Sequence, residues 1–499
     1  MKHILLILAA AFLSCIFSGC TEKGCKPNVV IIYTDDHNFW HIGAYGGRVL
    51  TPNLDRIVNE GARFNRFYVS SPVCTPSRYS LLTGRYAVRS AYLQKNQPTD
   101  QPAFIRWNTF LSKAEKTGAH LFREAGYATG MVGKYHLGGE FGYLGGDESY
   151  DDPAVRDTIA AIYTRWQQHV RDVAGFDYVE SLYGNNLHII GVPKSMQYHN
   201  MEWITKGAVD FIDQYRDQPF FLYMATTLPH VPGPLESLKA DPRITAAGML
   251  EAPITGVQPS RESVLERTRA AGIPEENAPL TWLDDGIGAV LDRLERYGLM
   301  ENTIIVFASD HQSPRGKMTC YEDAANAPAA IMWQGKIRPG QVHDALVSNV
   351  DIVPTILELA GIEQPADYRT DGRSWVGLLD GSVSSLHESL YLEVVYQRAV
   401  VTEKWKYMAV RFPDRVNQMI TPDNRREFTI EGERGQDRYY NDTIFPGYHD
   451  DDQLYNLTVD KGEQHNLAGE PEYSVRLKEM KRLLNAYSAD LPYAFGEFK

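Results

Sequence analysis

The sequence NVVIIYTDD, residues 28–36, is an apolar run rich in β-branched side chains that ends in two adjacent carboxylates. A continuous apolar run of this length is typical of a strand buried on both faces of a parallel sheet. Ligands of open α/β sheets bind beyond the carboxyl ends of such strands. The stretch therefore predicts a buried strand with Asp35 and Asp36 at a functional edge, although an adjacent Asp pair taken alone also suits a turn or a helix cap.

Similar apolar runs recur along the chain and are separated by segments of helical periodicity. The runs cover residues 128–132, 220–225, 303–308 and 329–333, and the helical segments include NLDRIVNEGARF after Thr51-Pro52, residues 280–297, and residues 351–360 closed by Gly361. This alternation predicts a large mixed, mostly parallel sheet between helices, which is an α/β fold. Residues 139–200 and 233–275 have weak periodicity, and we interpret them as insertions over the sheet.

The pattern of apolar residues changes after DGRSWVGLLDG, residues 371–381. Short strand-like pieces follow at 389–395 and 399–411, and an amphipathic helix is expected near 474–489. We therefore predict a catalytic α/β domain over residues 27–370. A smaller α+β subdomain with an antiparallel sheet and a terminal helix is expected over residues 371–499.

The N-terminus has the pattern of an export signal, because Lys2 and His3 precede an apolar run, residues 4–17, that is too short to span a membrane. The run ends in Gly19-Cys20, which looks like a bacterial lipobox. We expect residues 1–19 to be a signal peptide, Cys20 to be lipidated and residues 20–26 to form a tether. A plain signal peptide cleaved nearby is the alternative. The expected location is periplasmic or at the cell surface, with membrane contact through the lipid anchor only.

The composition excludes some classes of partner. The formal net charge of −13 over 499 residues argues against nucleic acid, whose phosphates need a basic surface. An anionic substrate must then be held by a local cationic cluster. Beyond the leader and the tether only Cys74 and Cys320 remain, so a disulfide scaffold is not expected.

The segment SPVCTPSRYSLLTGRY, residues 71–86, places Cys74 at the start of an expected helix. Thr75 would be the N-cap and Pro76 the first helical residue, so the thiol would lie at the positive end of the helix and Arg78 would project from its first turn. Such a thiol suits a nucleophile of depressed pKa. A buried structural cysteine at a helix cap fits the same pattern, and Cys320 is interpreted as an ordinary buried thiol.

The string CTPSR followed by LLTGR matches the CxPSRxxxLTGR signature of the sulfatase family, and the sequence is identified as a member of that family on this motif and several others. The resemblance implies an alkaline-phosphatase-like α/β fold. It continues in order over nearly the whole mature chain, through NVVIIYTDD, GMVGKYHLG (130–138), FFLYMATTLPHVP (220–232), TIIVFASDH (303–311), VDIVPTILELAGI (350–362) and QLYNLTVDKGEQHNLA (453–468).

The resemblance implies that Cys74 is oxidised to formylglycine by a formylglycine-generating or an anaerobic sulfatase-maturating enzyme. One oxygen of the hydrated aldehyde would attack sulfur, and the other would expel sulfate by re-forming the aldehyde. Asp35, Asp36, Asp310 and His311 would hold one divalent cation together with the modified Cys74, with Ca²⁺ expected first and Mg²⁺ second. His311 stands where many sulfatases have Asn, which resembles the iduronate-sulfatase branch. A role in orienting Asp310 is its alternative.

The resemblance also assigns roles to the cationic and imidazole groups. Arg78 and Lys134 would orient and polarise the formylglycine, Lys317 with His230 would protonate the leaving oxygen, and His136 would act as the base that releases sulfate. Residues next to the metal ligands are expected to rim the substrate pocket, namely His37, Trp40, His41, Gln312, Ser313 and Arg315.

The expected activity is hydrolysis of a sulfate ester on a carbohydrate, either a glycosaminoglycan or a mucin-type glycan. The glycan part of this prediction follows from the export signal and not from any pocket residue. A phosphate or phosphonate ester hydrolase of the same fold is the alternative among enzymes. An inactive glycan-binding surface lipoprotein is the alternative from another class.

Overall fold

The computed structural model describes residues 26–496 except residues 140, 143 and 232. The predicted signal peptide, Cys20 and nearly all of the tether lie outside the described residues, so they stay predictions. Within the described part, no helix is both long enough and apolar enough to cross a membrane.

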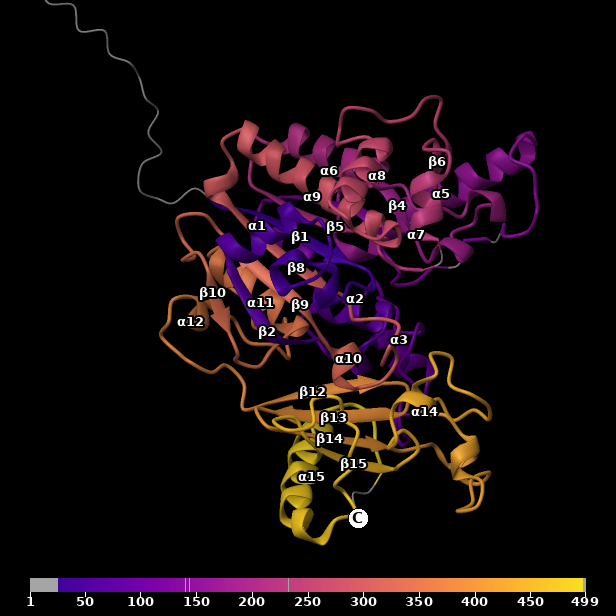
Figure 1. Cartoon of the computed structure of the whole chain (residues 1–499), viewed down its shortest axis with the longest axis vertical. Helices are drawn as coiled ribbons and strands as arrows, with labels where there is room; N and C mark the ends of the chain where they lie inside the picture. The colour runs from indigo at the N-terminus through magenta and orange to yellow at the C-terminus, as the bar shows by residue number, and fades with distance from the viewer. Residues whose placement is uncertain (1–25, 140, 143, 232, 497–499) are drawn as a thin grey trace, which may run out of the picture.

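A nine-stranded sheet forms the centre of the molecule (Figure 1). Its middle strands are parallel, whereas β9 runs antiparallel to both of its neighbours, so the sheet is mixed and mostly parallel as predicted. β11 (Val347–Ser348) pairs with β2 off the main path. The order along the sheet is β10 (Gln341–His343), β2 (Ala62–Tyr68), β9 (Asn326–Met332), β8 (Thr303–Ser309), β1 (Asn28–Thr34), β5 (Phe220–Ala225), β3 (Ala128–Lys134) and β4 (Tyr178–Tyr183).

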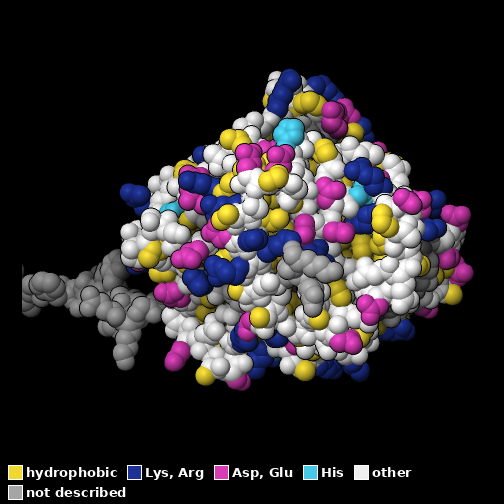
Figure 2. Space-filling view, turned by 90° about the horizontal axis from the view of Figure 1, so that it is seen from below, with side chains coloured by type: hydrophobic (Ala, Val, Ile, Leu, Met, Phe, Trp, Pro, Cys, Tyr) yellow, Lys and Arg dark blue, Asp and Glu magenta, His cyan; other side chains and the backbone are white. Residues whose placement is uncertain are grey.

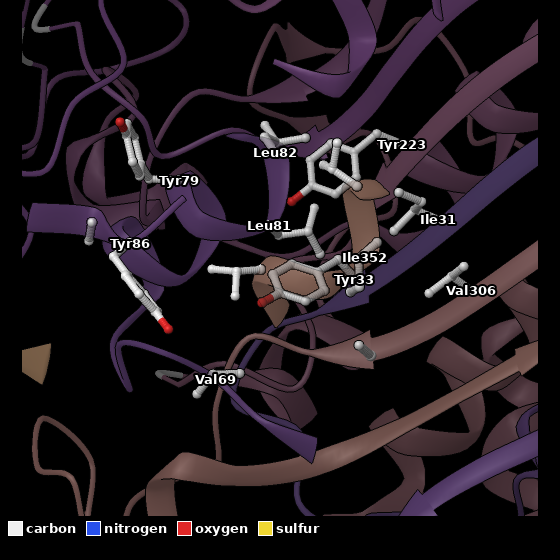
Figure 3. Packing of buried hydrophobic residues seen from close by; sticks show 14 of the residues in the cluster. Ile31, Tyr33, Val69, Tyr79, Leu81, Leu82, Tyr86, Tyr223, Val306 and Ile352 are labelled. Atoms are coloured by element: carbon white, nitrogen blue, oxygen red, sulfur yellow. The ribbon is translucent and has the colours of Figure 1, made fainter. Parts of the chain in front are cut away.

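The central strand β1 is buried on both faces, and its side chains alternate between two apolar clusters. Val29, Ile31 and Tyr33 belong to one cluster, and Val30 and Ile32 belong to the other. Figure 3 shows Ile31 and Tyr33 packed among Leu81, Leu82 and Tyr223 in the first cluster. The first cluster includes side chains of α2 (Cys74–Thr83), α4 (Gly118–Glu124), α5 (Pro153–Ala174) and α11 (Ile352–Leu359), and the second those of α1 (Pro52–Glu60), α6 (Met201–Tyr215) and α9 (Ala278–Arg296).

Two sequence interpretations need correction. The pattern of NLDRIVNEGARF predicts a helix throughout, but α1 ends at Glu60 and β2 begins at Ala62. Gly61 stands between them, where the backbone of Ile331 lies so close that a side chain would clash with it. Residues 139–200 are more than an insertion over the sheet. They supply the 22-residue helix α5 and the edge strand β4, which pairs with β3.

A second, antiparallel sheet lies at the C-terminal end of the molecule, with α15 (Ser474–Ser488) beside it (Figure 1). Its strands share an apolar cluster with Val73, Met318 and Cys320, so this sheet packs directly on the segments next to Cys74 and Lys317. Cationic and anionic side chains are interspersed over this end of the molecule (Figure 2). The strand order is β12 (Ser389–Val394), β13 (Gln397–Thr402), β14 (Trp405–Val410) and β15 (Asp452–Asn456).

Candidate active site

Four neighbouring parallel strands, β8, β1, β5 and β3, end at the same edge of the large sheet. Polar residues follow each strand at that edge, which is where ligands of α/β sheets bind. Strand pairing therefore brings together groups that are distant in the sequence. The groups contributed are Asp310 and His311 after β8, Asp35 and Asp36 after β1, His230 after β5, and Lys134 and His136 at the end of β3.

Cys74 is the first residue of α2, and its thiol lies at the centre of this edge. The predicted N-cap was wrong: Val73 is the N-cap, the Ser77 amide donates to its carbonyl at 3.1 Å, and the Thr75 hydroxyl has no partner among the described residues. All ten residues of the helix are buried. Burial raises the pKa of the Cys74 thiol, so an unmodified thiol here would be a poor nucleophile at neutral pH.

A buried group of potential metal ligands surrounds Cys74. One ligand atom from each of Asp35, Asp36, Cys74 and His311 lies within 4.8 Å of the others. Oδ1 of Asp35 is buried without a hydrogen-bond partner in the described part of the chain, which is expected of an atom that binds a cation. The carboxylate of Asp310 lies beside this group and accepts from the Asp36 amide at 3.0 Å. The carboxylate oxygens and the imidazole of this group fit a divalent cation.

A hydrogen bond at Nδ1 orients the ring of His311. Nδ1 lies 2.9 Å from the Gln312 carbonyl oxygen, to which it can donate, and Nε2 lies 3.4 Å from Sγ of Cys74. A hydrogen bond at one ring nitrogen fixes the tautomer and frees the other as a ligand. Nε2 is also 3.7 Å from Oδ1 of Asp310, so the predicted ligand role and the predicted orienting role are both geometrically open.

Three buried cations balance the three buried carboxylates. Nζ of Lys134 lies 2.5 Å from Oδ2 of Asp35, and Nζ of Lys317 lies 2.7 Å from Oδ1 of Asp36. Arg78 is fully buried and donates to Oδ2 of Asp310 at 3.0 Å.

These pairs decide the charge states of the carboxylates. Burial opposes the ionisation of Asp36, but Lys317, His230 and His311 together outweigh it and lower the pKa of Asp36 to about 2. Burial likewise opposes the charge on Lys317, yet Asp36 holds the pKa of this lysine well above its usual range. Burial and the charge of Asp35 raise the pKa of Asp310. A bound cation would favour the charged form of that carboxyl.

The two predicted acid–base histidines both lie in the cluster as neutral rings. His136 is buried, has a left-handed backbone with φ 58°, and its Nδ1 has no hydrogen-bond partner among the described residues. Burial, with Lys134 and Arg78, holds the pKa of His136 well below its usual value. Nε2 of His230 lies 3.9 Å from Oδ2 of Asp36. Burial lowers the pKa of His230 to about 3, so Lys317 is the better source of a proton.

The predicted pocket rim is only partly exposed to a ligand. The ring of His37 is fully buried, and its Nδ1 lies 3.1 Å from the Thr34 hydroxyl oxygen. Gln312 is buried too, and its amide donates to the Asn326 carbonyl at 2.6 Å. Trp40 is 53% exposed and lines a surface hollow of about 770 Å³. His41 caps the short 3-10 helix Phe39–His41, Ser313 bonds Asn38, and Arg315 pairs with Asp323.

Sequence reasoning missed three residues that the structure places in the cluster. Oδ1 of Asn186 accepts from Nζ of Lys134 at 2.6 Å. Nζ of Lys317 lies 5.5 Å from the ring centre of Tyr439. Asn441 accepts from the Gly316 amide at 2.9 Å and donates to the Lys317 carbonyl at 3.0 Å. Tyr439 and Asn441 come from the C-terminal part of the chain and belong to no motif, so only the folded structure reveals them.

Comparison with known proteins indicates a sulfatase, in agreement with the residues gathered in the site. The sulfatase family matches residues 27–362, and the C-terminal region of N-sulphoglucosamine sulphohydrolase matches residues 315–420. An N-acetylgalactosamine-6-O-sulfatase of Bacteroides thetaiotaomicron is 25% identical over 96% of this chain and 99% of its own. The N-acetylgalactosamine-6-sulfatase of Sus scrofa is 30% identical over 74% of this chain and 68% of its own.

Similar folds are also found among solved structures. A sulfatase structure from work on the metabolism of multiple glycosaminoglycans by Bacteroides thetaiotaomicron has a TM-score of 0.64 and 22% identity. It covers 93% of this chain, and this chain covers 99% of it. The chain belongs to the sulfatase family and is a sulfatase, with the α/β fold and the C-terminal antiparallel subdomain predicted from its sequence.

Proposed function

We propose that this sulfatase removes a sulfate ester from a glycosaminoglycan-type carbohydrate, with formylglycine made from Cys74 and one divalent cation in the buried cluster. One observation carries the proposal: a ligand atom from each of Cys74, Asp35, Asp36 and His311 lies within 4.8 Å of the others. Lys134 and Lys317 pair with the two carboxylates of this group. Ca²⁺ is the proposed ion, with Mg²⁺ second, because hard carboxylate oxygens dominate the donor set.

Formylglycine and the divalent cation would each supply one part of the chemistry. Formylglycine supplies a hydrated aldehyde whose hydroxyl is a nucleophile toward sulfur, in place of a thiol whose pKa burial raises. The cation supplies positive charge that polarises the sulfate oxygens. Asp35, Asp36, Asp310 and His311 are the residues that would hold it.

The chain's own residues then orient the ester and move protons. Lys134, held by Asp35 and Asn186, and Arg78, held by Asp310, place fixed positive charge beside Cys74. Lys317 keeps its proton at neutral pH and can donate it to the leaving oxygen. His136 is neutral, and its Nδ1 has no partner among the described residues, which suits a base.

Two relatives support the carbohydrate part of the proposal, since both are named for N-acetylgalactosamine 6-sulfate. A sulfated carbohydrate is therefore the proposed substrate, and a formylglycine-generating or anaerobic maturating enzyme the proposed partner in biosynthesis. Export, with a lipid anchor at Cys20 and a periplasmic or surface location, is proposed from the leader sequence alone. Metabolic labelling with a palmitate analogue tests the anchor, and label that persists in Cys20→Ala contradicts it.

The test of the activity measures sulfate release from N-acetylgalactosamine 6-sulfate, from a panel of other sulfated sugars and from a small aryl sulfate. Phosphate esters of the same alcohols serve as controls. We expect release of sulfate that stops when a chelator removes the cation and returns with Ca²⁺. Turnover of phosphate esters with none of the sulfate esters would contradict the proposal, as would activity that survives metal removal.

A further inference from the structure

A loop of the C-terminal part, residues 437–441, lies beside the catalytic cluster and exposes two side chains next to it. The ring of Tyr439 is partly exposed and faces the Lys317 ammonium at 5.5 Å. Its hydroxyl has no hydrogen-bond partner among the described residues. Arg438 precedes it and is exposed. The loop thus lies next to Lys317 and carries an exposed cation beside Tyr439.

The second feature is a tryptophan ring contacted by two guanidinium groups. Arg106 lies 4.2 Å from the ring centre of Trp107, and Arg438 lies 5.1 Å from it. Arg106 is neutralised by an ion pair with Glu431, whose side chain is only 8% exposed. Arg438 has no carboxylate within ion-pair distance in the described part of the chain. The positive charge of Arg438 is therefore held in place by the ring while its hydrogen-bonding edge stays available.

The loop that carries these groups is fixed by its own hydrogen bonds. Oδ2 of Asp437 accepts from the amides of Tyr439 and Asn441, both at 3.0 Å, and its Oδ1 accepts from the Tyr448 hydroxyl at 2.8 Å. Asn441 ties the loop to the Gly316 amide and the Lys317 carbonyl. A ligand bound there would lose little free energy to ordering the loop.

We propose that Arg438 and Tyr439 form a second anion subsite, which binds a carboxylate or a further sulfate on the same carbohydrate next to the ester being cleaved. The inference rests on the proposed function, because it places the carbohydrate next to both Lys317 and this loop. A guanidinium group can donate two parallel hydrogen bonds to two oxygens of either anion. The face and hydroxyl of Tyr439 suit a sugar ring, which is both apolar and hydrogen bonding. In a chain of net charge −13 such a substrate depends on local cations.

The test measures binding of three ligands to the full chain carrying Cys74→Ala, by titration calorimetry, so that no turnover is needed. N-acetylgalactosamine 6-sulfate has one anionic group, its 4,6-disulfate adds a sulfate, and a uronate-linked disaccharide 6-sulfate adds a carboxylate. Adding Arg438→Gln should weaken binding of one or both doubly anionic ligands about tenfold or more. Binding of the singly anionic ligand should change less than about threefold. The ligand that is weakened identifies the bound anion.

Arg434→Gln is the matched control, because Arg434 is also an exposed arginine that lies over an aromatic ring, 5.2 Å from the centre of Phe428. It should leave all three affinities unchanged. Equal weakening of the three ligands by Arg438→Gln, no weakening, or no binding of doubly anionic ligands by the parent would overturn the subsite. Turnover of an aryl sulfate by the unmutated enzyme is measured in parallel, and its absence would count against the proposed function instead.

Discussion

Asn441→Ala should break the contact by which the C-terminal part of the chain positions the segment that carries Lys317. The amide of Asn441 is fully buried and bonds the Gly316 amide at 2.9 Å and the Lys317 carbonyl at 3.0 Å. The substitution leaves both backbone groups without partners, at about 1–3 kcal/mol each, so the free energy of unfolding should fall by roughly 2–6 kcal/mol. Lys317 would also lose its fixed position over Asp36, and kcat/KM should fall by about tenfold or more.

Urea denaturation followed by tryptophan fluorescence measures the first effect, and turnover of an aryl sulfate by the folded variant measures the second. Asn65→Ala is the control, because the side-chain amide of Asn65 donates to the Asp344 carboxylate at 2.8 Å near the surface. It should shift both quantities little. A folded Asn441→Ala protein with unchanged kcat/KM would refute the idea that this side chain positions Lys317.

Three further predictions concern the thiols, the metal and pH. Cys74→Ala should abolish turnover with the fold retained, whereas Cys320→Ala should stay near wild type in an aryl sulfate assay; loss of activity in the latter with a normal fold would contradict this. His311→Asn should retain more bound divalent cation than His311→Ala, as measured by elemental analysis, because an amide oxygen can replace the imidazole; equal loss would argue against a ligand role. Burial raises the pKa of Asp284 from 3.8 to about 7, so the folded state keeps a proton that the unfolded state releases. Stability to urea should therefore fall as the pH rises through this interval, and Asp284→Asn should flatten the profile.

The sequence predicted those parts of the structure that depend on local pattern. The apolar run before Asp35 specified a strand buried on both faces, and the same pattern located β3, β5 and β8, whose ends carry the cluster. Because strands of one parallel sheet end at a common edge, their terminal polar residues can be grouped from the amino-acid sequence alone.

The remaining features depend on contacts between distant segments, which leave no periodic signal. His37 follows the metal pair in sequence, yet the turn after β1 directs it into the interior against Phe307. Tyr439 and Asn441 reach the site only because the C-terminal sheet packs on the segments around Val73 and Met318. The sequence analysis likewise did not predict α5 and β4 as parts of the main layers, and the stability of α5 comes from its tertiary packing.

Mass spectrometry of the tryptic peptide Phe67–Arg78 measures the central claim most directly. The protein is prepared in a host that contains a formylglycine-generating or anaerobic maturating enzyme, and Cys320 in the same digest serves as the internal control. We predict that Cys74 carries an aldehyde in place of its thiol, and that Cys320 stays a thiol. An unmodified Cys74 in fully active protein would contradict the claim that formylglycine at this position is the nucleophile.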